Sequence, residues 1–127
     1  MNRTKIVVYS RKRHLTALIT EIVGHNPAQT ICCTTIEQTI ATCQKERPTL
    51  VIILDTTPFI NGSNLIEQIR PPHTRLPYIY VVSWQQSEQI VVRLLECGVT
   101  QYMTFPICMS RLQNKIAALG LGTTPLT

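Results

Sequence analysis

Five short runs of apolar residues recur along this chain, and segments with the spacing of amphipathic helices separate them. The runs cover residues 5–9, 30–34, 50–54, 78–83 and 101–105. Strands that are apolar throughout are buried on both faces, as in parallel sheets that helices cover on both sides. The pattern therefore predicts five βα units that form a doubly wound, three-layer α/β sandwich with right-handed crossovers.

The segments between the runs carry apolar residues three and four positions apart, which places these residues on one face of a helix. These apolar positions are Leu15, Leu18, Ile19, Ile22 and Val23; Ile36, Ile40 and Cys43; Leu65, Ile66 and Ile69; Ile90, Val91, Leu94 and Leu95; and Leu112, Ile116 and Leu119. Pro48 and Gly98 are typical helix-ending residues. We expect one domain over residues 1–120 and a frayed tail over residues 121–127.

Composition narrows the classes of protein that fit. The formal net charge is +5, but five of the twelve basic residues lie in the first 13 positions and no aromatic residues are interleaved with the others, so we do not expect nucleic-acid binding. No apolar run reaches the roughly 18 residues that a membrane span needs, and the N-terminus does not resemble a signal peptide. The five cysteines have no metal-ligand spacing and are predicted to be buried thiols of a cytoplasmic protein.

The carboxyl ends of the predicted strands bring several polar residues to one edge of the sheet. Asp55, the only aspartate of the chain, ends the run at 50–54, and Ser10, Arg11, Ser83 and Phe105 end other runs. In open parallel sheets, ligands bind at this edge. The sequence therefore predicts a site there, with Asp55 at its centre.

Short motifs around these residues occur in a characteristic order. They are Asp55, Pro58 and Asn61-Gly62 before the segment GSNLIEQIR, then Leu76-Pro77 and Ser83, and finally GVTQY at 98–102 and Pro106. Taken together, they resemble the response-regulator receiver domains, the CheY-like family, over essentially the whole chain. The turn after Asp55 is one residue shorter than the family pattern. The resemblance implies a flavodoxin/CheY-type fold.

In that family an aspartate accepts a phosphoryl group from a sensor kinase, and the resemblance places this role on Asp55. It places a switch hydroxyl at Ser83 and a switch aromatic at Tyr102. An acidic pair that binds Mg²⁺ would fall on Ser10 and Arg11, and a phosphoryl-binding lysine would fall on Phe105. Mg²⁺ requires well-placed anionic oxygens, so these three departures predict a degenerate, pseudo-receiver site without a metal. We expect Arg11 to pair with Asp55 in place of the metal and the lysine.

The sequence thus predicts a stand-alone signalling domain that works through protein–protein contacts and is not an enzyme. The partner would be a sensor kinase, a transcription factor or another signalling protein, or a second copy bound through residues 88–119. An active single-domain phosphorelay regulator that uses Mg²⁺ and is phosphorylated on Asp55 is one alternative. A small anion- or nucleotide-binding module, with anions held by Arg11, Lys12 and helix N-termini, is another. Ser83 is open to two interpretations, a switch hydroxyl or a residue that closes a strand-end turn.

Overall fold

The computed structural model describes residues 5–12, 14, 17, 29–54, 68–70, 77–83, 88–96, 98–104 and 109–119. Strands and helices alternate along this part of the chain, as the sequence predicts. Their bounds are β1 Lys5–Tyr9, β2 Gln29–Cys33, α2 Ile36–Glu46, β3 Leu50–Leu54, β4 Tyr78–Ser83, α4 Glu88–Glu96, β5 Gln101–Thr104 and α5 Met109–Ala117. Residues 14, 17, 68 and 69 are also helical. No helix within these ranges is long and apolar enough to cross a membrane.

The five strands form one parallel sheet in the order β2-β1-β3-β4-β5. The chain therefore moves outward from β1 to β2, returns to β3 beside β1, and continues to β5 at the other edge. This order confirms the predicted doubly wound α/β fold, whose strand order reverses between β1 and β3. β3 is the central strand and β1 lies beside it, and the two strands end at Leu54 and Tyr9, next to Asp55 and Ser10 in the chain.

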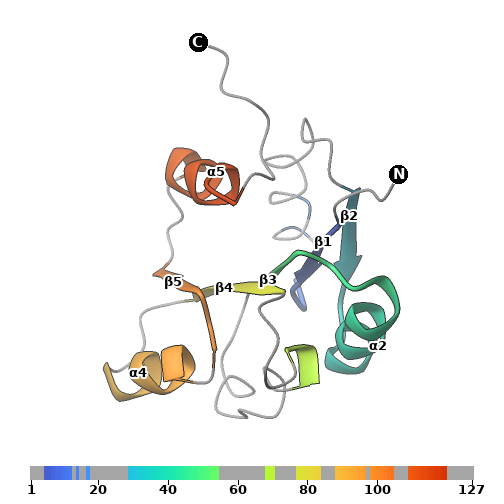
Figure 1. Cartoon of the computed structure of the whole chain (residues 1–127), viewed down its shortest axis with the longest axis horizontal. Coiled ribbons are helices and arrows are strands. Elements are labelled where there is room, and N and C mark those ends of the chain that lie inside the picture. The colour runs from blue at the N-terminus through green and yellow to red at the C-terminus, as the bar shows by residue number, and fades with distance from the viewer. Residues whose placement is uncertain are drawn as a thin grey trace.

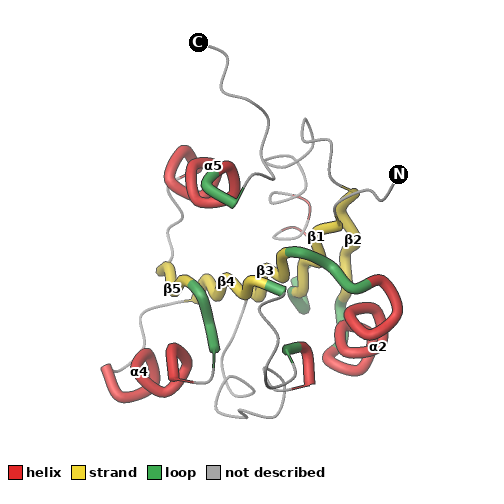
Figure 2. The backbone as a smooth tube through the Cα atoms, in the orientation of Figure 1, coloured by secondary structure: helices red, strands yellow, loops and turns green. Residues whose placement is uncertain are grey.

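Helices cover both faces of the sheet, with α5 on one side and α2 and α4 on the other (Figures 1 and 2). Alternate residues of each strand point to opposite faces, which divides the core into two clusters. One cluster packs strand residues such as Val51 and Ile53 with Cys43 and Ile69. The other packs Ile52 and Leu54 with α5. All of β3 is buried because both of its faces are covered.

The prediction that all five cysteines are buried is wrong for Cys32. Cys33 and Cys43 are buried, but Cys32 is exposed. Adjacent strand residues face opposite sides, and β2 is an edge strand, so Cys32 and Cys33 cannot share one environment. Burial, and then the neighbouring Cys33, raises the pKa of the Cys43 thiol to about 12, which keeps it protonated at neutral pH. Cys97 and Cys108 lie outside the described residues.

One strand differs slightly from its predicted range. β2 spans 29–33 rather than 30–34. β5 is described up to Thr104, and Phe105, its predicted last residue, lies outside the described residues. The predicted helices that begin near residues 15 and 62, and the tail at 121–127, lie wholly or largely outside the described residues. Thr35 caps α2 by accepting a hydrogen bond from the Gln38 backbone N–H at 3.0 Å, which explains why β2 gives way to α2 so abruptly.

Candidate functional site

Ser10 follows β1 at the carboxyl edge of the sheet and is completely buried. Its hydroxyl oxygen accepts a hydrogen bond from the backbone N–H of Lys12 at 3.0 Å, which is a local turn two residues long. Its own backbone N–H donates to the carbonyl of Cys33 at 3.2 Å. The first residue of the predicted acidic-pair position is thus a neutral hydroxyl whose lone pairs already stabilise the chain reversal after β1.

Arg11 and Lys12 are both exposed at the same strand end. Their exposure is typical of long cationic side chains, which keep their head groups in water. The predicted pairing of Arg11 with Asp55 stays a prediction, since Asp55 lies outside the described residues. Phe105, at the lysine position, also lies outside them.

Ser83 and Tyr102, the two predicted switch residues, lie together. The Ser83 hydroxyl and the Tyr102 hydroxyl are 2.9 Å apart, and either can donate the hydrogen bond. Ser83 is fully buried at the end of β4, and Tyr102 is partly buried on β5, packed against the cluster that contains Val81 and Val99. The two positions were identified separately from the sequence, but their direct bond was not predicted.

The register of the sheet relates Ser83 to the other site positions. Leu54, which precedes Asp55 in the chain, pairs with Val82, which precedes Ser83. Ser83 itself pairs with Thr104, which precedes Phe105. The last described residues of β3, β4 and β5 therefore end at matched levels of the same edge. This agrees with a common site at the carboxyl ends of the strands.

Within the described ranges, no three His, Cys, Asp or Glu side chains come together in a way that could hold a metal ion. The polar groups described at the carboxyl edge include the hydroxyls of Ser10 and Ser83, the Tyr102 hydroxyl that is bonded to Ser83, and the exposed cations of Arg11 and Lys12. Hydroxyls and cations can hydrogen-bond or neutralise an anion, but they do not supply the anionic oxygens that Mg²⁺ prefers.

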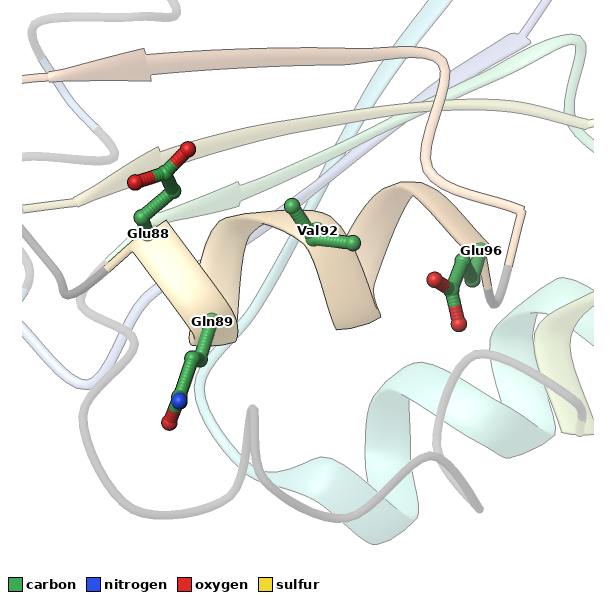
Figure 3. Close-up of a pocket in the computed structure, with 4 residues that line it drawn as sticks. All are labelled: Glu88, Gln89, Val92 and Glu96. Carbon is green, nitrogen blue, oxygen red and sulfur yellow. The ribbon is translucent and has the colours of Figure 1, made fainter.

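The Ser10–Lys12 turn is a feature that sequence reasoning missed. The signal was present, because a serine hydroxyl commonly accepts a hydrogen bond from the backbone two residues later. A second missed feature is a groove of about 360 Å³ on α4, lined by Glu88, Gln89, Val92 and Glu96 (Figure 3). Figure 3 shows Glu88 and Glu96 at opposite ends of the helix with Val92 between them.

Known proteins resemble this chain in sequence and in fold, although no protein-family model matches it. Over 76 residues, 60% of the chain, it is 33% identical to the transcriptional regulatory protein KdpE of Staphylococcus aureus, and the matched stretch spans 32% of that protein's length.

Two solved structures superpose on nearly the whole chain. A CheY-like response regulator receiver domain protein from Methanospirillum hungatei gives a TM-score of 0.80 at 18% identity, covering 93% of this chain and 94% of the other. A two-component response regulator from Clostridium difficile gives 0.80 at 17% identity, covering 92% and 95%. The fold is that of a CheY-like receiver domain.

Proposed function

We propose that this chain is a receiver-type signalling domain whose phosphoacceptor site, centred on Asp55, is degenerate. The fold shared with a CheY-like receiver domain protein and with a two-component response regulator supports the receiver assignment. The similarity to the transcriptional regulatory protein KdpE over 76 residues supports a regulatory role. The domain works by contact with other proteins, in the manner that its relatives' description as response regulators implies. Its upstream partner is then a sensor kinase or another signalling protein, and its output passes through an effector protein.

One observation carries the degenerate assignment, namely the buried Ser10 hydroxyl bonded to the Lys12 backbone N–H. In an active receiver the end of the first strand supplies acidic ligands to Mg²⁺. Here it supplies a neutral hydroxyl that is engaged in a turn and, at Arg11, an exposed cation. The donor set does not fit Mg²⁺, which sheds its water reluctantly and needs anionic oxygens in an octahedral arrangement. Metal binding therefore has no part in the proposed function.

The Ser83–Tyr102 bond supports the signalling assignment independently of the metal. The Ser83 hydroxyl at the end of β4 is hydrogen-bonded to the Tyr102 side chain on β5. A conformational change at the carboxyl edge of the sheet can therefore be transmitted to β5 through this bond. β5 lies beside α4, as Figure 1 shows. A domain that binds partners over α4 and β5 can thus couple that surface to its strand-end site even where phosphorylation is lost.

Phosphorylation of the intact protein tests the degenerate site. The protein is incubated with acetyl phosphate, with and without Mg²⁺, and its intact mass is measured. We expect no Mg²⁺-dependent gain of one phosphoryl mass, because Ser10 and Arg11 replace the anionic ligands. A gain that requires Mg²⁺ and disappears in Asp55→Asn would instead establish an active phosphorelay regulator.

A gain-of-function variant tests the same assignment through the appearance of phosphorylation. We expect Ser10→Asp/Arg11→Asp/Phe105→Lys to acquire Mg²⁺-dependent phosphorylation, since it restores two carboxylates and a cation at the positions where the family resemblance requires them. Adding Asp55→Asn to this variant is the matched control and should abolish the gain. Circular dichroism checks that the variant is folded. Arg11→Asp alone, at an exposed position, is a milder version that tests whether removing the cation is enough for Mg²⁺ binding.

A further inference from the structure

The outer face of α4 combines exposed apolar and acidic side chains. Glu88, Gln89, Val92, Leu95 and Glu96 are all exposed, and we call them the α4 surface. At 3.6 residues per turn they lie within an arc of about 120°, so they form a single face of the helix. Four of the five line the groove of about 360 Å³. The α4 surface is therefore one continuous feature with a hollow in it.

The centre of the α4 surface is apolar. Val92 is 45% exposed and Leu95 is 47% exposed, and they are the only large hydrophobic side chains that are exposed among the described residues. Because they are three positions apart on a helix, their exposed parts adjoin. Every other large apolar side chain whose burial is described is less exposed than these two, so this pair stands out as surface left for a partner.

The two ends of the α4 surface are acidic. Glu88 lies at the start of α4 and Glu96 at its end, about 12 Å apart along the axis at 1.5 Å per residue. Arg93 is the third charged residue of α4, and its side chain lies outside the described residues. The whole chain carries a net charge of +5, so an acidic and apolar face is opposite in sign to the rest of the molecule. Such a face attracts a cationic partner and selects against an anionic one.

A second copy of this chain is a poor occupant of the α4 surface. Two α4 helices related by a two-fold axis would bring Glu88 and Glu96 of one copy against those of the other, and like charges in contact are unfavourable. α5 offers the cations Arg111 and Lys115, but its outward side chains are polar and its Leu112 and Ile116 are buried. Among the α5 side chains whose burial is described, none is a large exposed apolar group that could cover Val92 and Leu95.

We propose that the α4 surface binds a basic amphipathic helix of another protein. The partner's apolar side chains cover Val92 and Leu95, and its lysines or arginines, placed about two turns apart, meet Glu88 and Glu96. This inference rests on the proposed signalling function and adds the chemistry of the partner. A helix suits the surface because two exposed apolar side chains three positions apart match the apolar stripe of a second helix packed alongside.

A synthetic peptide probes the surface directly. The 127-residue chain is titrated into fluorescently labelled LKKLLKLLKKLLKL, and binding is followed by fluorescence anisotropy at low and high salt. The acidic peptide LEELLELLEELLEL, with the same leucine stripe, is the control ligand. We expect the lysine peptide to bind, with an affinity that falls as salt rises, and the acidic peptide to bind far more weakly. Equal binding of both peptides, or no binding of the lysine peptide, would overturn the proposal.

Variants locate the binding. Leu95→Ser should weaken binding of the lysine peptide about tenfold, because roughly half of a leucine side chain is no longer transferred out of water. Glu88→Gln/Glu96→Gln should weaken it about threefold and reduce its salt dependence. Glu37→Gln, an exposed glutamate in the first turn of α2, is the matched control and should bind as the wild type does. Wild-type binding by both α4 variants would show that the peptide binds elsewhere.

The outcome is separable from the test of the proposed function. The peptide assay does not involve Asp55, and the phosphorylation assay does not involve α4. If the lysine peptide does not bind, the proposal of a basic-helix partner is wrong, but the degenerate receiver assignment is unaffected and is tested by the mass measurement. A Mg²⁺-dependent gain of a phosphoryl group at Asp55 would show that the site is not degenerate. The proposal for the α4 surface would then still be tested by the peptide-binding assay.

Discussion

The helices α4 and α5 have the same length and opposite relationships to the core. Each spans nine residues and carries an apolar stripe on one side. On α5 the apolar residues Leu112 and Ile116 are 0% and 2% exposed. On α4, Val92 and Leu95 are nearly half exposed. The difference shows that α5 uses its described apolar residues to close one face of the sheet, whereas α4 leaves part of its own uncovered.

Polar contacts repeat this contrast. On the α5 side, the Tyr80 hydroxyl donates to the backbone carbonyl of Lys115 at 2.6 Å, which ties α5 to β4. On the α4 side, Ser83 bonds to Tyr102, which joins two strands at the carboxyl edge of the sheet. One polar pair thus holds a helix in place, and the other connects a site residue to β5. We infer that α5 is chiefly structural and that the α4 side carries the recognition.

The largest effect is expected from truncating the buried leucine of α5. Leu112→Ala should lower the free energy of unfolding by about 2–5 kcal/mol, because it leaves a cavity against β4 and β5. Leu95→Ala on α4 should change it by no more than about 0.5 kcal/mol, since the side chain is already half in water. Urea unfolding measures both. Equal losses in the two variants would contradict the division of roles between the helices.

A smaller effect is expected at the hydrogen bond that anchors α5. Tyr80→Phe should cost about 0.5–1.5 kcal/mol, the usual net value of one hydrogen bond. Burial, and then the neighbouring Tyr78, raises the pKa of Tyr80 from 10.0 to about 12. The folded state therefore keeps its proton longer than the unfolded state, so the associated stability is present below pH 10 and is lost as the pH rises toward 12.

Urea unfolding at a series of alkaline pH values checks this reading of Tyr80. The wild type should lose stability between pH 10 and about 12, and Tyr80→Phe should show a shallower decline over that interval. Tyr78→Phe removes only the smaller cause of the raised Tyr80 pKa, so it should reduce the alkaline decline less than Tyr80→Phe does. An unchanged alkaline slope in Tyr80→Phe would show that Tyr80 does not hold its proton in the way proposed.

The smallest effect is expected from the polar pair on the α4 side. A double-mutant cycle with Ser83→Ala and Tyr102→Phe should give a coupling energy of about 0.5–1 kcal/mol, because the hydroxyls share one hydrogen bond and Tyr102 is only partly buried. Peptide binding to the α4 surface, measured in the same variants, tests whether the pair influences that surface. Strict additivity of the two stability changes would mean that the bond contributes nothing in solution.

Most of the fold was predictable because its signals are local. Continuous apolar runs such as 50–54 indicate strands with two covered faces, and three- and four-residue spacing indicates the helices between them. The boundaries of β2 were off by one residue, since Gln29 joins the strand through its backbone pairing with Lys5, which its side chain does not reveal. The exposure of Cys32 was missed for a related reason, because apolar character does not tell which strand lies at the edge.

Which site residues lie at strand ends could be predicted from the sequence, but the bonds that these residues make could not. The resemblance located Ser10, Ser83 and Tyr102, and chain order placed Ser10 and Ser83 at strand ends. The bond between Ser83 and Tyr102 joins residues 19 positions apart and depends on the register of β4 and β5. The Ser10–Lys12 turn is local, but a serine followed by two basic residues does not by itself distinguish a buried hydroxyl from an exposed one.

The sequence by itself determined the order of strands and helices and the residues at the strand ends, because periodicity and turn chemistry are properties of neighbouring residues. It also determined that α4 and α5 each have an apolar stripe. Only the tertiary structure decided that Leu112 is covered and that Leu95 is not. The two leucines have equivalent positions in the sequence pattern of their helices. Their exposure differs because the burial of a helix face depends on which segments pack against it, and these segments are distant in the chain.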